Sequence, residues 1–259
     1  MNRAAGLKVN NKVKIKSVLI SQPEPKNVRS PFYDLKDKYN IKIDFRPFIV
    51  IEGVSVKEFR KEKIDILEHT AVVMTSRTSI EHFFRICEGL KLEVPADMKY
   101  FCVTEAVALY LQKYITYRKR KVFFFFIKDK VLEDYILKHK GEKYLIPKSN
   151  VSKNDLPDYL KKKKIKYTEA TMYKTVANDL SDLKNVNYDI LAFFSPSGID
   201  SLFENFPDFK QNNTKIAAFG PSTCQAVIDR GLNLDIQAPS PQAPSMKMAL
   251  EQYIIQQEK

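Results

Sequence analysis

The sequence predicts an α/β protein whose parallel sheets are covered by helices on both faces, and three features indicate this class. Short apolar stretches typical of strands alternate along the chain with segments of helical periodicity. Turns of small polar residues follow many of these stretches. Segments of the first half also recur in the same order in the second half, as in a duplicated structure. The 259 residues suffice for about two domains of typical size.

The two copies of the internal repeat share few identical residues, but their matching segments occur in the same order. The aligned pairs are Leu19 with Leu145, Ile41 with Ile165, Ser76 with Ser195, and Thr104 with Gly220. The separation between partners shrinks in small steps along the chain, as loop deletions in one copy would produce. Two halves of similar architecture follow from this repeat.

Signals at the ends of elements predict the first half in order. The expected strands are 13–20, 41–51 and 71–75, and the expected helices are 30–39 and 79–90. Ser30 fits the N-cap of the first helix and Pro31 its first position. Apolar residues at i, i+3, i+4 and i+7 from Ile80 predict the second helix, and Gly89 marks its expected end.

The second half follows the same order of elements. The expected strands are 142–146, 165–176, 189–194 and 215–219, and the expected helices are 154–163, 198–206 and 222–230. Gly231 is the expected stop of the last of these helices. Strands that alternate with helices in this way predict parallel pairing.

Four polar turns follow expected strands, at 75–78, 147–150, 195–198 and 220–223. Open α/β sheets bind ligands outside the carboxyl ends of their strands. Free backbone N–H groups and the positive end of a helix dipole would suit carboxylates or phosphates there. Ser and Thr are also the usual N-caps of helices that bind nothing. Both interpretations stay open at this point.

The charge indicates a polyanionic partner. The 43 basic and 31 acidic residues leave a net charge of +12, which fits nucleic acid, acidic lipid or an acidic small molecule. The basic runs 118–121 and 161–166 contain few aromatic residues. We interpret both runs as solvated surface.

Several function classes lack their sequence signals. The longest apolar stretches, such as 122–127, are far shorter than the roughly 20 residues of a membrane span. The N-terminal segment does not have the pattern of a secretory signal. We therefore expect a cytoplasmic protein without membrane contact. Three separated cysteines and three scattered histidines predict buried, inert thiols and no metal site. Without a P-loop, a dinucleotide fingerprint or a nucleophile elbow, we expect neither a cofactor nor an acyl-transfer triad.

Several segments, taken in order, resemble the uroporphyrinogen-III synthase family, whose members close linear hydroxymethylbilane into an asymmetric macrocycle in the heme pathway. The similar segments are 72–84, 144–176, 191–203, 215–232 and 238–245. Two features depart from the family pattern: Ser21-Gln22-Pro23 stands where the family often has Arg-Pro, and 104–107 replaces a Gly-x-x-Thr turn. We therefore expect the turn at 220–223 to bind substrate more strongly than its first-half counterpart.

The resemblance implies two flavodoxin-like, doubly wound α/β domains joined by a two-stranded linker. The first domain would comprise 1–47 and 175–259, and the second 48–174, with linker strands near Pro47 and Tyr173. Two such strands can act as a hinge. The repeat alone also allows simple tandem halves split near residue 130.

The chemistry that the resemblance implies is that of a cyclising hydro-lyase. Loss of the terminal hydroxyl gives an azafulvene, and attack by the far pyrrole, fragmentation and reclosure invert the last ring. The pyrrole nitrogens supply the electrons, so the protein mainly positions a flexible chain. Tyr173, in Met-Tyr-Lys-Thr, matches a tyrosine that could protonate the departing hydroxyl. A strand tyrosine packed at a domain interface is the alternative.

The resemblance also implies a substrate-binding set that contacts acetate and propionate groups. Its members are Ser76, Arg77, Thr78, Ser149, Asn150, Ser195, Ser197, Gly198, Gly220, Ser222 and Thr223. The expected partner is a small molecule with eight carboxylates, bound without cofactor by a monomer that contacts the preceding pathway enzyme at most transiently. Arg77 could also be a solvent-exposed arginine at a helix start.

A second function class is a non-catalytic module that binds an acidic ligand or single-stranded nucleic acid. The charge of +12 favours it. The lysine runs lack the stacking aromatics of such nucleic-acid sites, which disfavours it and leads us to expect no nucleic-acid partner.

Overall fold

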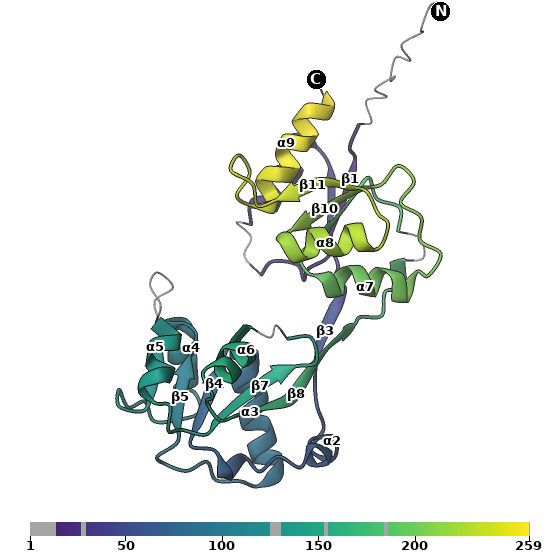
Figure 1. The fold of residues 1–259 in the computed structure, drawn as a ribbon. Helices are drawn as coiled ribbons and strands as arrows, with labels where there is room; N and C mark the ends of the chain where they lie inside the picture. The colour runs from purple at the N-terminus through teal and green to yellow at the C-terminus, as the bar shows by residue number, and fades with distance from the viewer. Residues whose placement is uncertain (1–13, 27–29, 125–130, 153–154, 184–185, 259) are drawn as a thin grey trace, which may run out of the picture. The chain divides into compact units, whose positions relative to one another are not determined.

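The computed structural model describes residues 14–26, 30–124, 131–152, 155–183 and 186–258 (Figure 1). The chain divides into two compact units. Unit 1 comprises residues 1–50 and 176–259, and unit 2 comprises residues 51–175. The domain boundaries expected after residues 47 and 174 remain predictions.

Unit 1 is built on a five-stranded parallel sheet in the order β2-β1-β9-β10-β11. Its strands are β1 (Ser17–Ile20), β2 (Lys42–Phe45), β9 (Ile190–Phe193), β10 (Lys215–Phe219) and β11 (Leu234–Ala238). Its helices are α1 (Pro31–Tyr39), α7 (Pro196–Asn205), α8 (Pro221–Asp229) and α9 (Met246–Glu258). Counted along the chain, the strand order is 2-1-3-4-5, the flavodoxin-like order.

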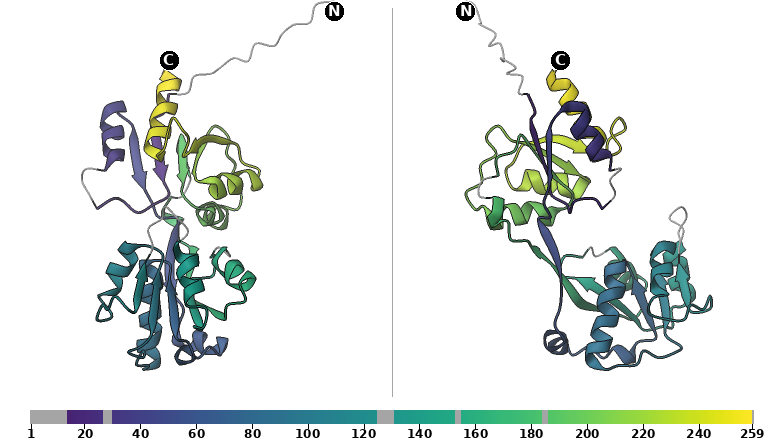
Figure 2. Two further views of the ribbon diagram at one scale, coloured as in Figure 1. Left: turned by 60° about the vertical axis from the view of Figure 1, so that its left-hand side comes forward. Right: turned by 180° about the vertical axis from the view of Figure 1, so that it is seen from behind.

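Alternate residues of the strands of unit 1 enter two separate cores. Val18 and Ile20 pack with residues of α1 and α9, whereas Leu19 packs with residues of α7 and α8. Successive strand side chains point to opposite faces, so both faces of the sheet are covered. Figure 2 shows the two helical layers of this unit.

Unit 2 carries a six-stranded sheet in the order β3-β8-β7-β4-β5-β6. Its strands are β3 (Ile49–Gly53), β4 (Ala71–Met74), β5 (Lys99–Cys102), β6 (Val122–Phe124), β7 (Tyr144–Ser149) and β8 (Tyr167–Ala177). Its helices are α2 (Val56–Phe59), α3 (Arg77–Leu90), α4 (Glu105–Leu111), α5 (Val131–Lys138) and α6 (Asp155–Lys162), with short 3₁₀ turns at 60–62 and 66–68. Helices α3 and α4 share one core, and α5 and α6 share the other.

The internal repeat aligns equivalent strands of the two sheets. The pairs are β1 with β7, β2 with β8, β9 with β4, and β10 with β5. When β7 and β8 are counted first, unit 2 also has the flavodoxin-like order, so its chain order is a circular permutation of that of unit 1. The predicted fold class is confirmed. Tandem halves split near residue 130 are wrong, because β1 pairs with β9.

The stretch 41–51 was expected to form one long strand, and this prediction is wrong. It forms β2 in one sheet and β3 in the other, with a break at Pro47. Proline has no N–H to donate to a ladder. Beyond the break, Asn178 N–H donates to the Phe48 carbonyl and Val54 N–H donates to the Met172 carbonyl. These two bonds pair β3 with β8 in antiparallel directions, where the chain enters unit 2 and leaves it.

The end of α3 also differs from the sequence-based expectation. The helix continues past Gly89 to Leu90, and Lys91 adopts the left-handed conformation that ends it. A Cβ atom at Gly89 would lie 2.4 Å from the Val56 side chain. Gly89 therefore permits close packing of α2 against α3 instead of ending the helix.

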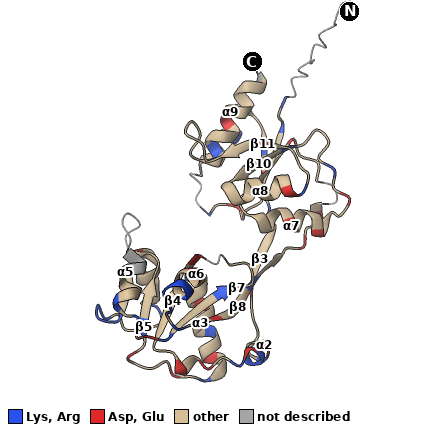
Figure 3. Ribbon diagram, in the orientation of Figure 1, with Lys and Arg blue, Asp and Glu red and all other residues tan. Residues whose placement is uncertain are grey.

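The cysteines and basic runs lie where the sequence predicted. Cys87, Cys102 and Cys224 are free and buried, and burial raises the pKa of Cys87 and of Cys102 to about 12. All five lysines of 161–166 are exposed, and basic and acidic residues are interspersed on both units (Figure 3). Part of the apolar stretch 122–127, beyond Phe124, and the first residue of the expected helix 154–163 lie outside the described residues. None of the helices in the described ranges is long and apolar enough to cross a membrane.

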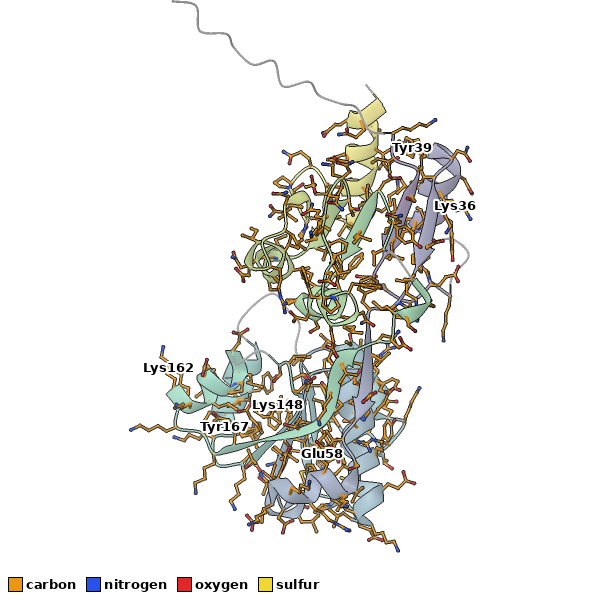
Figure 4. All side chains as sticks on the ribbon, turned by 90° about the vertical axis from the view of Figure 1, so that its right-hand side faces the viewer. Lys36, Tyr39, Glu58, Lys148, Lys162 and Tyr167 are labelled. Carbon is orange, nitrogen blue, oxygen red and sulfur yellow. The ribbon has the colours of Figure 1, made fainter. Side chains whose placement is uncertain are left out.

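Glu251 on α9 joins that helix to α1 in unit 1. Its carboxylate accepts hydrogen bonds from Lys247, from Lys38 at 2.9 Å and from the Tyr39 hydroxyl at 3.2 Å (Tyr39 is labelled in Figure 4). These bonds, led by that from Lys247, lower the pKa of Glu251 to about 2.

We expect Glu251→Gln to lower the free energy of unfolding by about 1 kcal/mol at pH 7, because the ion pairs are solvent-accessible. A carboxyl whose pKa falls on folding contributes stability above its ordinary pKa of 4.5, and that stability is lost as the pH falls toward 2. Urea unfolding at pH 7 and at pH 2.5 measures the difference. Glu204→Gln, at an exposed position of α7, is the control. An effect of Glu251→Gln that is equal at both pH values would contradict the assignment.

Candidate functional site

The polar turns predicted from sequence lie at the carboxyl ends of strands in both sheets. In unit 1 they follow β9 and β10, and in unit 2 one follows β4. The turn expected at 147–150 is wrong for its first three residues, because β7 continues through Ser149 and only Asn150 lies beyond it. Each of β4, β9 and β10 leads directly into the first turn of a helix. This edge is where open α/β sheets bind ligands.

Ser76 is the N-cap of α3 and is part of a capping box. Its hydroxyl accepts from Ser79 N–H at 3.0 Å, while the Ser79 hydroxyl accepts from the N–H groups of Thr75 and Ser76. Ser79 is fully buried. The amides of Arg77 and Thr78, in the first helical turn, have no intrahelical carbonyl to bind. The turn is thus rigid and presents these two donors.

Tyr173 lies on β8 and packs against the start of α3. It is 9% exposed, and Ser149 is its register partner on β7. Its ring stacks on the His82 imidazole, with ring centroids 5.1 Å apart and planes 18° apart. Burial raises the pKa of Tyr173 above its ordinary value of 10.0, and the nearby Ser76 hydroxyl opposes this in part. The phenol is therefore protonated at neutral pH.

Ser149 and Asn150 are held against the end of β8. The Ser149 hydroxyl donates to Asn150 Oδ1 at 2.9 Å and lies 3.2 Å from the Thr175 hydroxyl. Asn150 Oδ1 also accepts from Thr175 N–H at 2.8 Å. These bonds fix the end of β7, and Asn150, directly after it, is exposed to solvent.

A small cavity of about 70 Å³ opens beside Tyr173, between β7, β8 and α6. Thr75, Lys148 and Glu169 contribute polar groups to its lining. Lys148 donates to Glu169 at 2.7 Å, and Figure 4 labels Lys148 on β7. Lys148 is a cation at the strand edge that the predicted binding set omitted, although it lies within the predicted turn 147–150.

Arg77 and Thr78 follow the Ser76 cap at the start of α3. Arg77 is exposed, and its guanidinium lies over the Tyr110 ring, 5.2 Å from the ring centroid. Thr78 is half-buried. The aromatic contact orients the guanidinium while it stays accessible to an acidic ligand.

In unit 1, Ser195 is the N-cap of α7. Its hydroxyl accepts from Gly198 N–H at 3.3 Å. Gly198 is buried, and a Cβ atom there would lie 3.4 Å from the Phe193 ring and 3.8 Å from the Ser21 hydroxyl. Ser21, at the end of β1, thus lies beside the Ser195 turn. Ser197 is half-exposed in the first turn of the helix.

The turn after β10 differs from the others because no side chain caps α8. Its N-cap is Gly220, at φ +90° and ψ 149°, a conformation essentially restricted to glycine. Pro221 has no N–H, so Ser222 and Thr223 supply the free amides of the first turn. Ser222 is exposed and Thr223 is 1% exposed. At the equivalent position in unit 2, Thr104 caps α4 by accepting from Val107 N–H.

A larger cavity of about 570 Å³ lies at the opposite edge of the sheet of unit 2, near the start of β5. Met98, Tyr100 and Tyr114 are among its lining residues, and none of the polar turns belongs to it. Within the described residues, no group of three or more His, Cys, Asp or Glu side chains could hold a metal ion. The candidate residues are therefore the polar turns of each unit and, in unit 2, Tyr173.

Sequence reasoning missed three side chains around Tyr173. Ser79 could have been found from its capping-box spacing to Ser76. His82 and Arg85 lie on one face of α3 at i, i+3 spacing, but their partners on β8 and beyond β3 are distant in sequence. No local pattern reveals those partners.

The fold and the candidate residues define a class: an open α/β protein with two mainly parallel sheets and donor-rich turns at the carboxyl ends of their strands. The sequence profile described as Uroporphyrinogen-III synthase HemD matches residues 35–247. The chain belongs to the uroporphyrinogen-III synthase family, and the resemblance seen in the sequence is confirmed. Members of this family are enzymes of heme synthesis.

Solved structures of low sequence identity share the fold. Uroporphyrinogen-III synthetase from Helicobacter pylori is 15% identical, with a TM-score of 0.61 over 93% of this chain and 100% of that chain. A mutant uroporphyrinogen III synthase from the extremely thermophilic bacterium Thermus thermophilus is 14% identical, with a TM-score of 0.52 over 93% of this chain and 99% of that chain. No curated protein matches the sequence closely enough to count as a relative.

Proposed function

We propose that this protein is a uroporphyrinogen-III synthase, a hydro-lyase that closes hydroxymethylbilane with loss of water and inversion of the terminal pyrrole ring. The family match over residues 35–247 is the observation that carries this proposal. The donor-rich turns support it, because a substrate with eight carboxylates needs many anion contacts. We further propose that the protein acts in the cytoplasm as a monomer, that units 1 and 2 are its two domains, and that its contact with the preceding pathway enzyme is at most transient.

The proposed binding groups are backbone amides and side-chain hydroxyls, amides and a guanidinium of these segments. In unit 2 these are Ser76, Arg77, Thr78, Ser149 and Asn150, and in unit 1 they are Ser195, Ser197, Gly198, Gly220, Ser222 and Thr223. Among them, the backbone amides of Ser222 and Thr223 are the most available to a ligand, because Gly220 has no side chain that could cap them. Arg77 can pair with a carboxylate through two parallel hydrogen bonds.

The proposed acid is Tyr173. Its phenol O–H would donate to the departing hydroxyl, so that water leaves instead of hydroxide. The pyrrole nitrogens of the substrate push the leaving group out, and this chain's own residues need only orient the terminal ring and supply that proton. Positioning then selects ring inversion over direct closure.

The rate of cyclisation tests the proposed activity. We expect the purified protein, without added cofactor, to convert fresh hydroxymethylbilane to cyclised product faster than the spontaneous closure in a protein-free control. Equal rates from a folded sample would contradict the proposal. Absorbance of the oxidised porphyrin after timed quenching measures the rate.

The pH dependence of turnover tests the acid. Because burial raises the pKa of Tyr173 above 10.0, the active protonated form persists throughout the neutral and mildly alkaline range. We expect kcat at saturating substrate to be level between about pH 7 and pH 9 and to fall only above about pH 10. Circular dichroism over the same range controls for unfolding. A fall with a midpoint below pH 9 that is absent from Tyr173→Phe would contradict the assignment.

Ser222→Asp tests the uncapped turn, because it should have opposite effects on stability and on binding. A carboxylate in the first turn stabilises a helix by about 0.3–1 kcal/mol through the helix dipole. The same charge would repel a substrate carboxylate and raise KM about tenfold, equivalent to about 1.4 kcal/mol of binding. Ser222→Asn is the neutral control. Thermal unfolding and substrate saturation curves measure both effects, and an unchanged KM would remove the turn from the binding site.

A further inference from the structure

The ring of Tyr173 is covered by helix α3. His82, on the second turn of α3, stacks on it, and the Ser76 hydroxyl at the N-cap partly offsets the rise in the phenol pKa that burial causes. The centroid distance of 5.1 Å and the angle of 18° describe a stacked pair. Ser76 is itself fixed by the capping box with Ser79. The position of α3 therefore sets the plane of the ring.

Arg85 fixes the orientation of His82. Its Nε–H donates to His82 Nδ1 at 3.1 Å. Because a guanidinium is always a donor, Nδ1 is the acceptor and the His82 proton lies on Nε2. Burial, and then the neighbouring Arg85 charge, lower the pKa of His82, so its imidazole is neutral at pH 7. A neutral imidazole beside the phenol does not favour the phenolate, and Tyr173 stays protonated.

The same guanidinium also holds the backbone next to Tyr173. Arg85 Nη2 donates to the Val54 carbonyl at 2.7 Å and to the Met172 carbonyl at 3.1 Å. Met172 directly precedes Tyr173. Gly53 leaves the room for this contact, because a Cβ atom there would lie 2.7 Å from the guanidinium carbon. One side chain thus fixes both the strand that carries Tyr173 and the ring that stacks on it.

We propose that His82 and Arg85 are positioning residues that hold Tyr173 in the orientation from which it donates its proton. This inference rests on the proposed function, because it gives Tyr173 its role. Neither residue touches the substrate in this account. Their effect on turnover passes entirely through Tyr173.

Three variants separate the parts of this arrangement. His82→Leu removes the flat ring and the Nδ1 acceptor, and we expect it to lower kcat about tenfold with KM unchanged within twofold. His82→Phe keeps a stacked ring and should retain most of kcat. Gly53→Ala displaces the Arg85 guanidinium while both His82 and Arg85 stay unsubstituted, and it should lower kcat severalfold. Glu88→Gln, on an exposed turn of the same helix, is the control and should behave like wild type.

A double-mutant cycle distinguishes positioning from a general structural role. In a Tyr173→Phe background, His82→Leu should lower kcat less than twofold, because the group that it positions is gone. A tenfold loss in both backgrounds would overturn the inference. An unchanged kcat for His82→Leu in the wild-type background, alongside normal synthase activity, would overturn it while leaving the proposed function intact.

A readout independent of activity covers the case in which the proposed function fails. In protein with ¹³C-labelled tyrosine rings, the Tyr173 resonance is identified by its loss in Tyr173→Phe. His82→Leu and Gly53→Ala should both shift this resonance, because the stacked ring or its orientation changes, whereas Glu88→Gln should not. An unshifted Tyr173 resonance in His82→Leu would overturn the positioning role even if the enzyme is active.

Discussion

Tyr173→Phe is expected to lower kcat about 100-fold without abolishing turnover. General acid catalysis contributes about 10²–10⁴-fold, and the lower end applies here because the substrate loses its hydroxyl readily without help. The substitution removes only the O–H group. The phenylalanine ring can still stack on His82 and fill the same space, since Tyr173 is 9% exposed and packs in the core with α3. KM should change little.

The matched control is Tyr100→Phe. Tyr100 is 3% exposed and lies on β5 in the same unit, lining the cavity at the opposite edge of the sheet. It should keep wild-type kcat. Steady-state rates at saturating substrate measure both variants, and a wild-type kcat for Tyr173→Phe would exclude the phenol from the mechanism. A combined loss of kcat and of thermal stability would instead point to a structural role.

Phe193→Ala is expected to lower the free energy of unfolding by about 3–5 kcal/mol. Phe193 is fully buried at the end of β9 and packs edge-on against Phe48, with ring centroids 5.5 Å apart and planes 81° apart. Its ring also lies under Gly198 in the Ser195 turn. Removing it leaves a cavity beneath the turn as well as the cost of the lost apolar contacts.

Two further variants keep this prediction testable. Phe193→Leu refills most of the space and should cost less than the alanine variant, which covers the case in which Phe193→Ala does not fold. Phe194→Ala changes the neighbouring half-buried ring and should cost less still. Urea unfolding monitored by circular dichroism measures all three. A loss of less than about 1 kcal/mol for Phe193→Ala would show that this core is not packed as described.

Local signals predicted the polar turns, but the helices expected from residues 79 and 198 begin two residues earlier, at Arg77 and Pro196. Ser76 and Ser195 each follow a buried strand and precede a helix, and both are N-caps in the structure. Thr104 and Gly220 were aligned by the repeat, and their difference in capping follows from residue type alone, because glycine has no side chain. The expectation that the later turn binds more strongly stays a prediction, but the free amides of α8 give it a physical basis.

The features that the sequence did not predict depend on contacts between segments that are distant along the chain. The break at Pro47 separates two strands that belong to different sheets, and only the pairing of β3 with β8 shows it. The role of Gly89 depends on the approach of Val56 from another helix. Arg85 reaches carbonyls that lie 31 and 87 residues away along the chain. Periodicity and caps carry no information on these pairs.

The isomer of the product is the most direct test of the central claim. Freshly generated hydroxymethylbilane is added to the purified protein without cofactor or metal, and the type I and type III porphyrins are separated after oxidation. We predict that type III dominates, with the type I isomer of the protein-free control suppressed, and that Tyr173→Phe forms type III more slowly. Only the type I isomer from a folded sample would contradict the account, because the protein would then have the family's fold without controlling ring inversion.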